Sequence, residues 1–161
     1  QAIARMRASD HDLVKPYAKS IRLVIGLFCT ETFDYASLVL RKLKIEKKID
    51  PAQIKKMDVK GKLEILMQEG DKSILALNDL ETCVRNGCHI CTDLTSLYSD
   101  ISAGAIGSPD GSTTLVIRTP TGKNFVESAV RNGKLTITGG VDTAAIEKLA
   151  NAKIKKNSGK K

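Results

Sequence analysis

Ile21-Arg-Leu-Val-Ile-Gly-Leu-Phe-Cys29 is the stretch that decides the fold of this 161-residue chain. Arg22 is its one charged residue, and the rest of the run is apolar or glycine. Such a run is typical of a strand that is buried on both faces in a parallel sheet. Because parallel strands are usually joined by helices, we predict an α/β (mixed α+β) fold. We expect a single domain with a mixed sheet of buried parallel-type strands and flanking helices.

The rest of the chain alternates helical and strand patterns, as this fold class requires. We predict helices over 1–8, from Thr30 or Thr32 to about Lys44, over 123–132 and over 143–156 after Asp142, and a short helix that begins at Pro51 after Asp50. We predict strands over 56–68 as a hairpin around Gly61, and over 72–77, 112–119 and 134–138, with turns at 69–71 and 120–122.

The chain carries a net charge of +8, and its lysines gather over 42–56 and in the last nine residues. They form either a solvated surface with a flexible basic tail or a face that attracts an anionic partner. With three Phe, three Tyr and no Trp, the chain offers few rings on which bases could stack, so a nucleic-acid partner is disfavoured. We expect no membrane span, because no run of about 20 apolar residues occurs. The chain opens at Gln1 in the middle of a helical pattern, so we expect it to be a piece of a longer protein.

Three of the four cysteines form a Cys-x4-Cys-x2-Cys pattern: Cys83, Cys88 and Cys91. A Cys-x2-Cys turn lets two sulfurs point toward one centre, and Gly87 frees the backbone to wrap around it. Such thiolates can bind zinc or an iron–sulfur cluster, and each of these needs four ligands. Cys29, at the end of the predicted strand, is the one further cysteine in the chain. The candidate metal ligands are therefore Cys29, Cys83, Cys88 and Cys91.

Other interpretations of these residues stay open. Four cysteines in a small secreted domain usually form disulfides, but this chain is long enough to build a core without them. Reduced thiols and a cytoplasmic location are therefore favoured. Cys29 as a small buried apolar side chain and Cys83 as an incidental thiol are the alternatives to ligation. His89 is either a spacer or a replacement for one thiol at zinc, and we expect His11 at the surface.

A glycine-rich loop follows the cysteines and reads Gly104-Ala-Ile-Gly107-Ser108-Pro109-Asp110-Gly111, before three hydroxyl residues. Glycines let backbone approach a ligand closely, and backbone amides, hydroxyls and an arginine can bind a pyrophosphate. The pattern is neither a Walker A nor a GxGxxG motif, and an ordinary Ser-Pro-Asp-Gly turn is the alternative. The candidate cofactor-binding residues are Gly104, Gly107, Ser108, Pro109, Gly111, Thr113, Thr114 and Arg118.

Several segments follow one another in a specific order and spacing over about residues 1–135. They are Gln1-Ala-Ile-Ala-Arg-Met, Ile25-Gly-Leu-Phe-Cys29, Phe33-Asp-Tyr35, Lys56-Met-Asp58, Gly87-Cys88-His-Ile-Cys91-Thr-Asp93, Asp100-Ile-Ser102, Gly107-Ser-Pro109 and Thr114-Leu-Val-Ile-Arg118-Thr. Together they resemble the C-terminal domain of the coenzyme F-420 (F420) hydrogenase/dehydrogenase beta subunits. These are the deazaflavin-handling subunits of methanogen hydrogenases, formate dehydrogenases and related oxidoreductases.

The resemblance implies one 4Fe-4S cluster and one FAD per subunit. Electrons would pass from the cluster through the flavin to or from coenzyme F420, an 8-hydroxy-5-deazaflavin. The cysteines that match cluster positions are Cys29, Cys88 and Cys91. The fourth ligand is either Cys83 or a cysteine that related sequences carry in a Gly-Thr-Pro-Cys segment upstream of residue 1. The loop over 104–114, with Arg118, matches the flavin-contacting region.

On this resemblance, residues 1–150 form the iron–sulfur and flavin-binding C-terminal domain of a longer oxidoreductase subunit, and residues 151–161 form a flexible basic tail. The expected partners are other oxidoreductase subunits with iron–sulfur centres and the protein's own N-terminal half. Much of the flavin site would lie in that half, so we expect the isolated fragment to bind FAD poorly and to be inactive. The alternative class is a structural or nucleic-acid-binding module in which four cysteines bind zinc, and a third interpretation is a cofactor-free scaffold that docks partner subunits.

Overall fold

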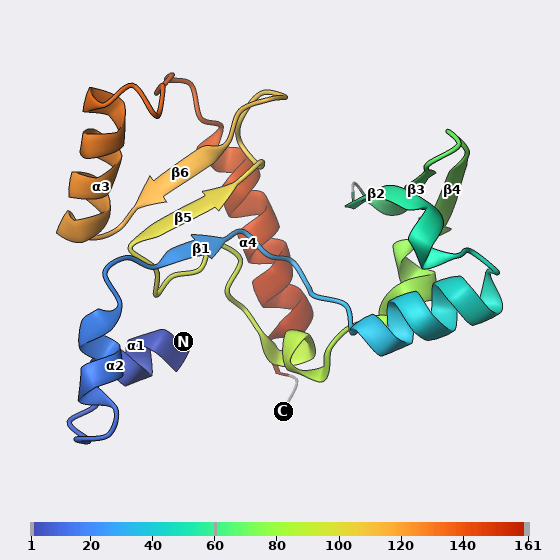
Figure 1. Cartoon of the computed structure of the whole chain (residues 1–161), viewed down its shortest axis with the longest axis horizontal. Coiled ribbons are helices and arrows are strands. Elements are labelled where there is room, and N and C mark those ends of the chain that lie inside the picture. Colours follow the sequence, from blue (N-terminus) through green and yellow to red (C-terminus); the bar gives the residue numbers. More distant parts are fainter. Residues whose placement is uncertain (1, 60, 160–161) are drawn as a thin grey trace. The chain divides into compact units, whose positions relative to one another are not determined.

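A computed structural model describes residues 2–59 and 61–159 (Figure 1). The predicted mixed α/β fold is confirmed, with two three-stranded sheets and flanking helices. The internal contacts gather into two compact units. Unit 1 comprises Gln1–Thr30 and Cys91–Gly159, and unit 2 comprises Glu31–Ile90. Unit 2 is thus inserted in the sequence between the two segments of unit 1. Within the described residues, none of the helices is long and apolar enough to span a membrane.

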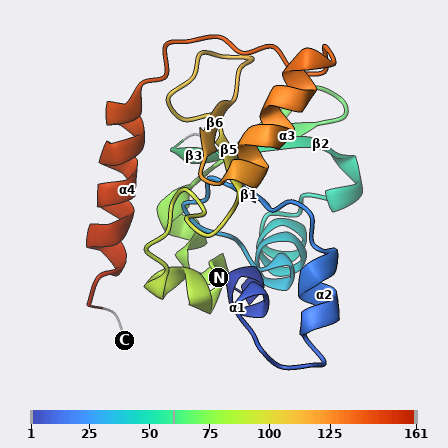
Figure 2. The same ribbon diagram turned by 90° about the vertical axis from the view of Figure 1, so that its left-hand side faces the viewer.

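Unit 1 has a sheet of strand order β1-β5-β6, in which β1 and β5 are parallel and β5 and β6 are antiparallel. Its elements are α1 (Ala2–Arg7), α2 (Lys15–Ser20), β1 (Ile25–Leu27), β5 (Ile101–Gly104), β6 (Thr114–Ile117), α3 (Pro120–Arg131) and α4 (Thr143–Asn157). The two views agree that α3 and α4 lie on opposite sides of this sheet (Figures 1 and 2). The sheet therefore separates an α3 side from an α4 side.

The strand predicted over 21–29 is shorter and more exposed than expected. β1 lies at the edge of the sheet, and the side chains of Ile25 and Leu27 are exposed. Its parallel pairing is as predicted, but burial on both faces is wrong. The apolar run marks a strand correctly, yet it cannot indicate whether this unit contains enough other elements to cover both faces.

The start of α3 corrects the turn that was predicted over 120–122. Thr119 has extended backbone, and its Oγ1 accepts a hydrogen bond from the Gly122 N–H at 3.1 Å. Pro120 takes the first helical position, where its missing N–H costs nothing. The same Thr-Pro pair that reads as a turn therefore begins a helix. The strand predicted over 134–138 is also wrong, because this segment is irregular.

The final helix has the predicted N-terminus and a longer C-terminus. Asp142 caps α4 by accepting a hydrogen bond from the Ala145 N–H at 3.0 Å. The helix continues to Asn157, and Lys153 and Asn157 are buried. Over 151–157 the predicted flexible tail is thus replaced by packed helix, while residues 160 and 161 lie outside the described residues.

Unit 2 packs helices against an antiparallel sheet of order β2-β3-β4. Its elements are η1 (Ala36–Glu46), η2 (Pro51–Gln53), β2 (Ile54–Val59), β3 (Lys62–Met67), β4 (Lys72–Ala76), η3 (Leu77–Cys83) and η4 (Asn86–Ile90). The predicted hairpin is present, and Gly61 takes a left-handed φ of 71° at its turn. Alternation in β3 buries Leu63 and Ile65 and leaves the charged residues beside them more exposed. The predicted first helix of this unit begins at Ala36 rather than at Thr30 or Thr32.

Candidate functional site

Unit 1 carries two of the candidate ligands, Cys29 and Cys91, and both are half-buried. The Cys29 N–H donates to the Leu94 carbonyl at 2.8 Å, so the chain two residues beyond β1 is bound to the segment that follows Cys91. The Cys91 Sγ lies 3.7 Å from the Asp93 carbonyl oxygen. The fold thus fixes the backbone around both thiols without burying either one in an apolar core.

Unit 2 carries the other two cysteines, and they differ in burial. Cys88, in η4, is half-buried, and its Sγ accepts a hydrogen bond from the Thr32 N–H at 3.3 Å. Cys83 is 0% exposed and packs in the core among Leu43 and Leu80, with its Sγ 3.5 Å from the Ser37 carbonyl oxygen. Cys83 therefore fits a small core side chain better than a ligand that must reach a cluster.

The described residues do not gather three His, Cys, Asp or Glu side chains at one point that could hold a metal ion. His89 is half-buried, and its Nδ1 lies 3.8 Å from the Glu81 carboxylate. His11 is exposed at the surface, as expected, and its Nδ1 accepts a hydrogen bond from the Leu13 N–H at 3.2 Å. The thiols of Cys29 and Cys91 in unit 1 and of Cys88 in unit 2 are each half-buried and are of the chemical type that binds an iron–sulfur cluster, and their ligation stays a prediction.

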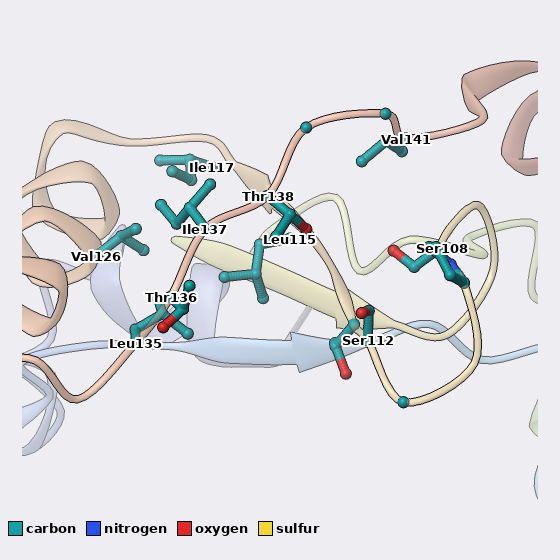
Figure 3. A pocket seen from close by; sticks show the side chains of 15 residues that line it. Ser108, Ser112, Leu115, Ile117, Val126, Leu135, Thr136, Ile137, Thr138 and Val141 are labelled. Carbon is teal, nitrogen blue, oxygen red and sulfur yellow. The ribbon is translucent and has the colours of Figure 1, made fainter.

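The predicted cofactor loop forms one wall of a groove of about 590 Å³ within unit 1 (Figure 3). The opposite wall is the irregular segment over 135–141, and Val126 of α3 closes one end. Leu115 and Ile117 of β6 form an apolar floor, with Ile137 facing them. The lining residues are Ser108, Pro109, Gly111, Ser112, Thr113, Leu115, Ile117, Val126, Leu135, Thr136, Ile137, Thr138, Gly139, Gly140 and Val141.

The groove is neutral and amphipathic. None of its 15 lining residues, all of them described by the structure, is Asp, Glu, His, Lys or Arg. The lining also carries the hydroxyls of Ser112, Thr113, Thr136 and Thr138 in addition to the apolar floor. Small-molecule sites usually combine apolar walls with a few polar groups in this way, so the groove suits a flat organic ring better than a phosphate.

The alternation of β6 decides which predicted residues reach this groove. Thr113, Leu115 and Ile117 line it, whereas Thr114 and Arg118 do not. Because successive side chains of a strand point to opposite faces, these two belong to the other side of the sheet. There the Thr114 Oγ1 donates to the Ile106 carbonyl at 2.9 Å, and the structure uses its hydroxyl locally.

Arg118 is likewise held within unit 1. Its Nε donates to the Ser102 Oγ at 3.2 Å, and its Nη2 donates to the Thr95 carbonyl at 3.2 Å and to the Thr95 Oγ1 at 2.9 Å. The guanidinium thus ties β6 to β5 and to the segment before it. In this arrangement Arg118 positions the sheet rather than offering a charge to the groove.

Two of the predicted glycines make close backbone packing contacts. A Cβ at Gly104 would overlap the side chain of Phe28, the residue that follows β1. Gly107 has φ +86°, and a Cβ there would lie 2.7 Å from the Asp142 carbonyl oxygen. Its own carbonyl accepts the Asp142 N–H at 2.8 Å. The structure therefore uses both glycines for packing, and of the predicted loop it leaves Ser108, Pro109, Gly111 and Thr113 on the groove.

Sequence reasoning missed the floor of the groove, its far wall and the role of α4. Leu115 and Ile117 are two positions apart on one strand, and Leu135 and Ile137 repeat this spacing further on. This paired alternation is a signal for two segments with facing apolar side chains, and it could have located the groove. Lys153 and Asn157 on α4 carried no such signal, because a lysine-rich C-terminus predicts a solvated tail.

Comparisons with known proteins identify the family of this chain. The family model that describes the C terminus of the coenzyme F420 hydrogenase/dehydrogenase beta subunit matches residues 1–143. Coenzyme F420 hydrogenase subunit beta of Methanosarcina barkeri is 34% identical over 146 residues, which is 85% of this chain and 48% of that protein. Coenzyme F420-dependent sulfite reductase of Methanocaldococcus jannaschii is 36% identical over 137 residues, which is 84% of this chain and 20% of that protein.

A solved structure agrees with these matches. A chain of the F420-reducing [NiFe] hydrogenase complex from Methanosarcina barkeri superposes with a TM-score of 0.84 at 31% identity, covering 98% of this chain and 55% of that one. The chain belongs to the coenzyme F420 hydrogenase/dehydrogenase beta subunit family and corresponds to its C-terminal part. It spans about half or less of the length of these relatives.

Proposed function

We propose that this chain is part of an oxidoreductase subunit that passes electrons from a 4Fe-4S cluster through FAD to or from coenzyme F420. Family membership supports the oxidoreductase class, because relatives include a coenzyme F420 hydrogenase subunit beta and a coenzyme F420-dependent sulfite reductase. The proposed partners are other oxidoreductase subunits with iron–sulfur centres and the N-terminal half of the same protein. Because these relatives are named for different second substrates, the electron donor is left to experiment.

The observation that carries the proposal is the contrast among the four cysteines. Three are half-buried, and the fourth, Cys83, is fully buried in a hydrophobic core. We assign the cluster to Cys29, Cys88 and Cys91, with a cysteine from the rest of the subunit as the fourth ligand. The Thr32 N–H donates to the Cys88 Sγ at 3.3 Å, and hydrogen bonds of this kind to sulfur are common around iron–sulfur clusters.

For the flavin, we assign the ring to the groove beside β6. Ser108, Pro109, Gly111 and Thr113 supply a close backbone wall and hydroxyls, and Leu115 with Ile117 supplies an apolar floor. FAD, when bound, supplies the exchange between single electrons and a hydride. The chain's own contribution is to orient the ring and to exclude water from one of its faces. The neutral lining leaves the pyrophosphate to cations elsewhere in the subunit.

The full-length subunit, purified without oxygen, tests this proposal. We expect iron and sulfide in a ratio that fits one 4Fe-4S cluster, one flavin per subunit, and a change in F420 absorbance when an electron donor or acceptor is supplied. Brown protein whose visible absorbance is bleached by dithionite would support the cluster. Colourless protein with one bound zinc would refute the proposal and favour the four-cysteine zinc module instead.

A variant on the floor of the groove separates the flavin assignment from the cluster assignment. Ile117 is 44% exposed and lines the groove, so Ile117→Glu should lower flavin content at least tenfold, since burying a carboxylate against a ring costs more than about 1.4 kcal/mol. Iron content should stay at the wild-type level. Ile74→Glu, on an exposed strand position of unit 2, is the matched control and should keep both. Equal flavin content in Ile117→Glu and Ile74→Glu would refute the placement of the ring.

A further inference from the structure

Helix α4 buries two polar side chains on one face, beyond residue 143 where the family model ends. Lys153 is 7% exposed and Asn157 is 4% exposed, although both belong to a helix that is otherwise rich in exposed lysines. The two residues are one turn apart, so they share one side of the helix. A buried lysine is unusual, because removing a charge from water is costly unless other groups stabilise it.

Both partners of Lys153 are backbone carbonyls next to candidate ligands. Its Nζ donates to the Cys29 carbonyl at 2.6 Å and to the Asp93 carbonyl at 2.7 Å. These two carbonyls lie in different stretches of unit 1, one shortly after β1 and one two residues after Cys91. The ammonium therefore joins the two segments of unit 1 that carry its cysteines.

Asn157 continues this arrangement one turn further along α4. Its Nδ2 donates to the Cys91 carbonyl at 2.6 Å. Together, Lys153 and Asn157 bind the carbonyl oxygens of both cysteines in this unit, while neither contact involves the sulfur atoms. The peptide groups that carry both thiols are therefore held in place by contacts to their carbonyl oxygens.

We propose that Lys153 and Asn157 are positioning residues for the cluster, and that the charge of Lys153 raises the reduction potential of that cluster. The inference rests on the proposed function, because it takes Cys29 and Cys91 as ligands. One-electron reduction adds a negative charge to a 4Fe-4S cluster. A fixed positive charge bound to the peptide of a ligand stabilises that reduced state, and it acts strongly because it is shielded from water.

The two hydrogen bonds of Lys153 hold the backbone in place, and its charge is a further feature that this structural role does not require. Buried ionic groups contribute little net stability, and apolar residues of similar size often replace them without loss. Methionine would fill the same space as the Lys153 stem. What methionine cannot supply is two donors and a charge beside the cysteine segments, and these are the features that a metal site can use.

The test uses the full-length subunit and three variants. Lys153→Met removes the charge and the hydrogen bonds to the Cys29 and Asp93 carbonyls. Asn157→Leu removes the hydrogen bond to the Cys91 carbonyl without a change of charge, and Lys155→Met removes an exposed charge from the same helix. We measure iron content, the midpoint potential of the cluster and the EPR spectrum of its reduced form. In metal-free protein we also measure the rate at which a thiol reagent modifies Cys29 and Cys91.

Lys153→Met should shift the midpoint potential to more negative values, and Asn157→Leu should lower cluster occupancy with a much smaller shift in potential. Lys155→Met should match the wild type. In metal-free protein, Lys153→Met and Asn157→Leu should both speed thiol modification severalfold. If Lys153→Met cannot hold a cluster, faster thiol modification in folded protein still supports positioning, and unchanged modification overturns it. A full cluster at an unchanged potential in Lys153→Met overturns this inference alone, whereas wild-type protein without a cluster overturns the proposed function as well.

Discussion

Asp100 is the residue whose loss should damage unit 1 most, because one buried carboxylate holds four elements together. It is 3% exposed and accepts hydrogen bonds from the Val24 N–H at 2.8 Å, the Thr119 hydroxyl at 2.8 Å and the Arg7 Nη1 at 3.1 Å. These donors belong to α1, the residue before β1, and the junction between β6 and α3. Asp100→Asn keeps the shape of the side chain. Its amide NH2 group then faces one of these donors and cannot accept the hydrogen bond.

The loss in the free energy of unfolding that we expect for Asp100→Asn follows from these contacts. Arg7 is one-third exposed, so water replaces much of its interaction. The two bonds from Val24 and Thr119 are shielded, and losing one charge-assisted bond while leaving its donor unpaired costs about 2–3 kcal/mol. Asp12→Asn is the control, because its side chain is 95% exposed and its ion pair with Lys15 spans 3.4 Å. Asp12→Asn should change the free energy of unfolding by no more than about 0.5 kcal/mol.

The dependence on pH provides an independent check. Burial by itself raises the pKa of Asp100, but hydrogen bonds from Thr119, Val24 and Arg7 outweigh it and hold the pKa below its usual value. A lowered pKa in the folded state stabilises the protein fully above the unfolded-state pKa of about 3.9. This advantage of the wild type over Asp100→Asn should shrink as the pH falls below about 4 and through the lower folded-state value.

Urea unfolding of the full-length subunit measures the difference in stability, and hydrogen exchange over residues 2–7 and at Val24 reports where it arises. Faster exchange at these sites in Asp100→Asn is expected, with Asp12→Asn unchanged. If Asp100→Asn and Asp12→Asn shift the urea midpoint equally, the carboxylate does not hold α1 and β1 in the way that the hydrogen bonds indicate.

Three further changes test the candidate sites in the full-length subunit. Cys83→Ala should keep the cluster and lower stability by about 1–2 kcal/mol, because it leaves a small cavity in a packed core; loss of the reduced-cluster EPR signal would make Cys83 a ligand. Cys88→Ser and Cys91→Ser should each abolish cluster incorporation, and full iron content in either variant would contradict the assignment. Gly107→Val should destabilise the fold by about 1–3 kcal/mol, since φ is +86° and its Cβ would meet the Asp142 carbonyl. If Gly107→Val loses flavin but keeps the thermal stability of the wild type, Gly107 contacts the flavin directly.

Much of the fold could be predicted where local chemistry decides the structure. The hairpin around Gly61, the Asp50 and Asp142 caps and the helix that ends before Gly133 all follow from residues within a few positions of one another. The exposure of β1 could not be predicted in this way. Whether Ile25 and Leu27 are covered depends on the other elements of the unit, which an apolar run does not specify.

In the candidate site, too, the sequence predicts what residue type decides and misses what depends on packing. Residue type located the loop over 108–113, but the face toward which each side chain points depends on the register of β6 with β5. Thr113 and Thr114 are adjacent and equivalent in sequence, yet only Thr113 lines the groove. The burial of Cys83 is likewise set by the packing of η1 and η3, and its place in a ligand-like spacing gave no sign of it.

The contacts of Arg118 have a consequence for flavin binding. Sequence reasoning assigned its charge to a phosphate, but its guanidinium is bound to Ser102 and Thr95 on the side of β6 away from the groove. A pyrophosphate needs cations or several backbone amides, and the groove is lined by uncharged residues. The ring and the pyrophosphate of a bound FAD would then depend on different parts of the subunit. An isolated C-terminal piece should therefore bind free flavin ring compounds, such as riboflavin, about as tightly as FAD, because the phosphates would add no contact. A preference for FAD of more than tenfold, about 1.4 kcal/mol, would show that this chain also holds the pyrophosphate.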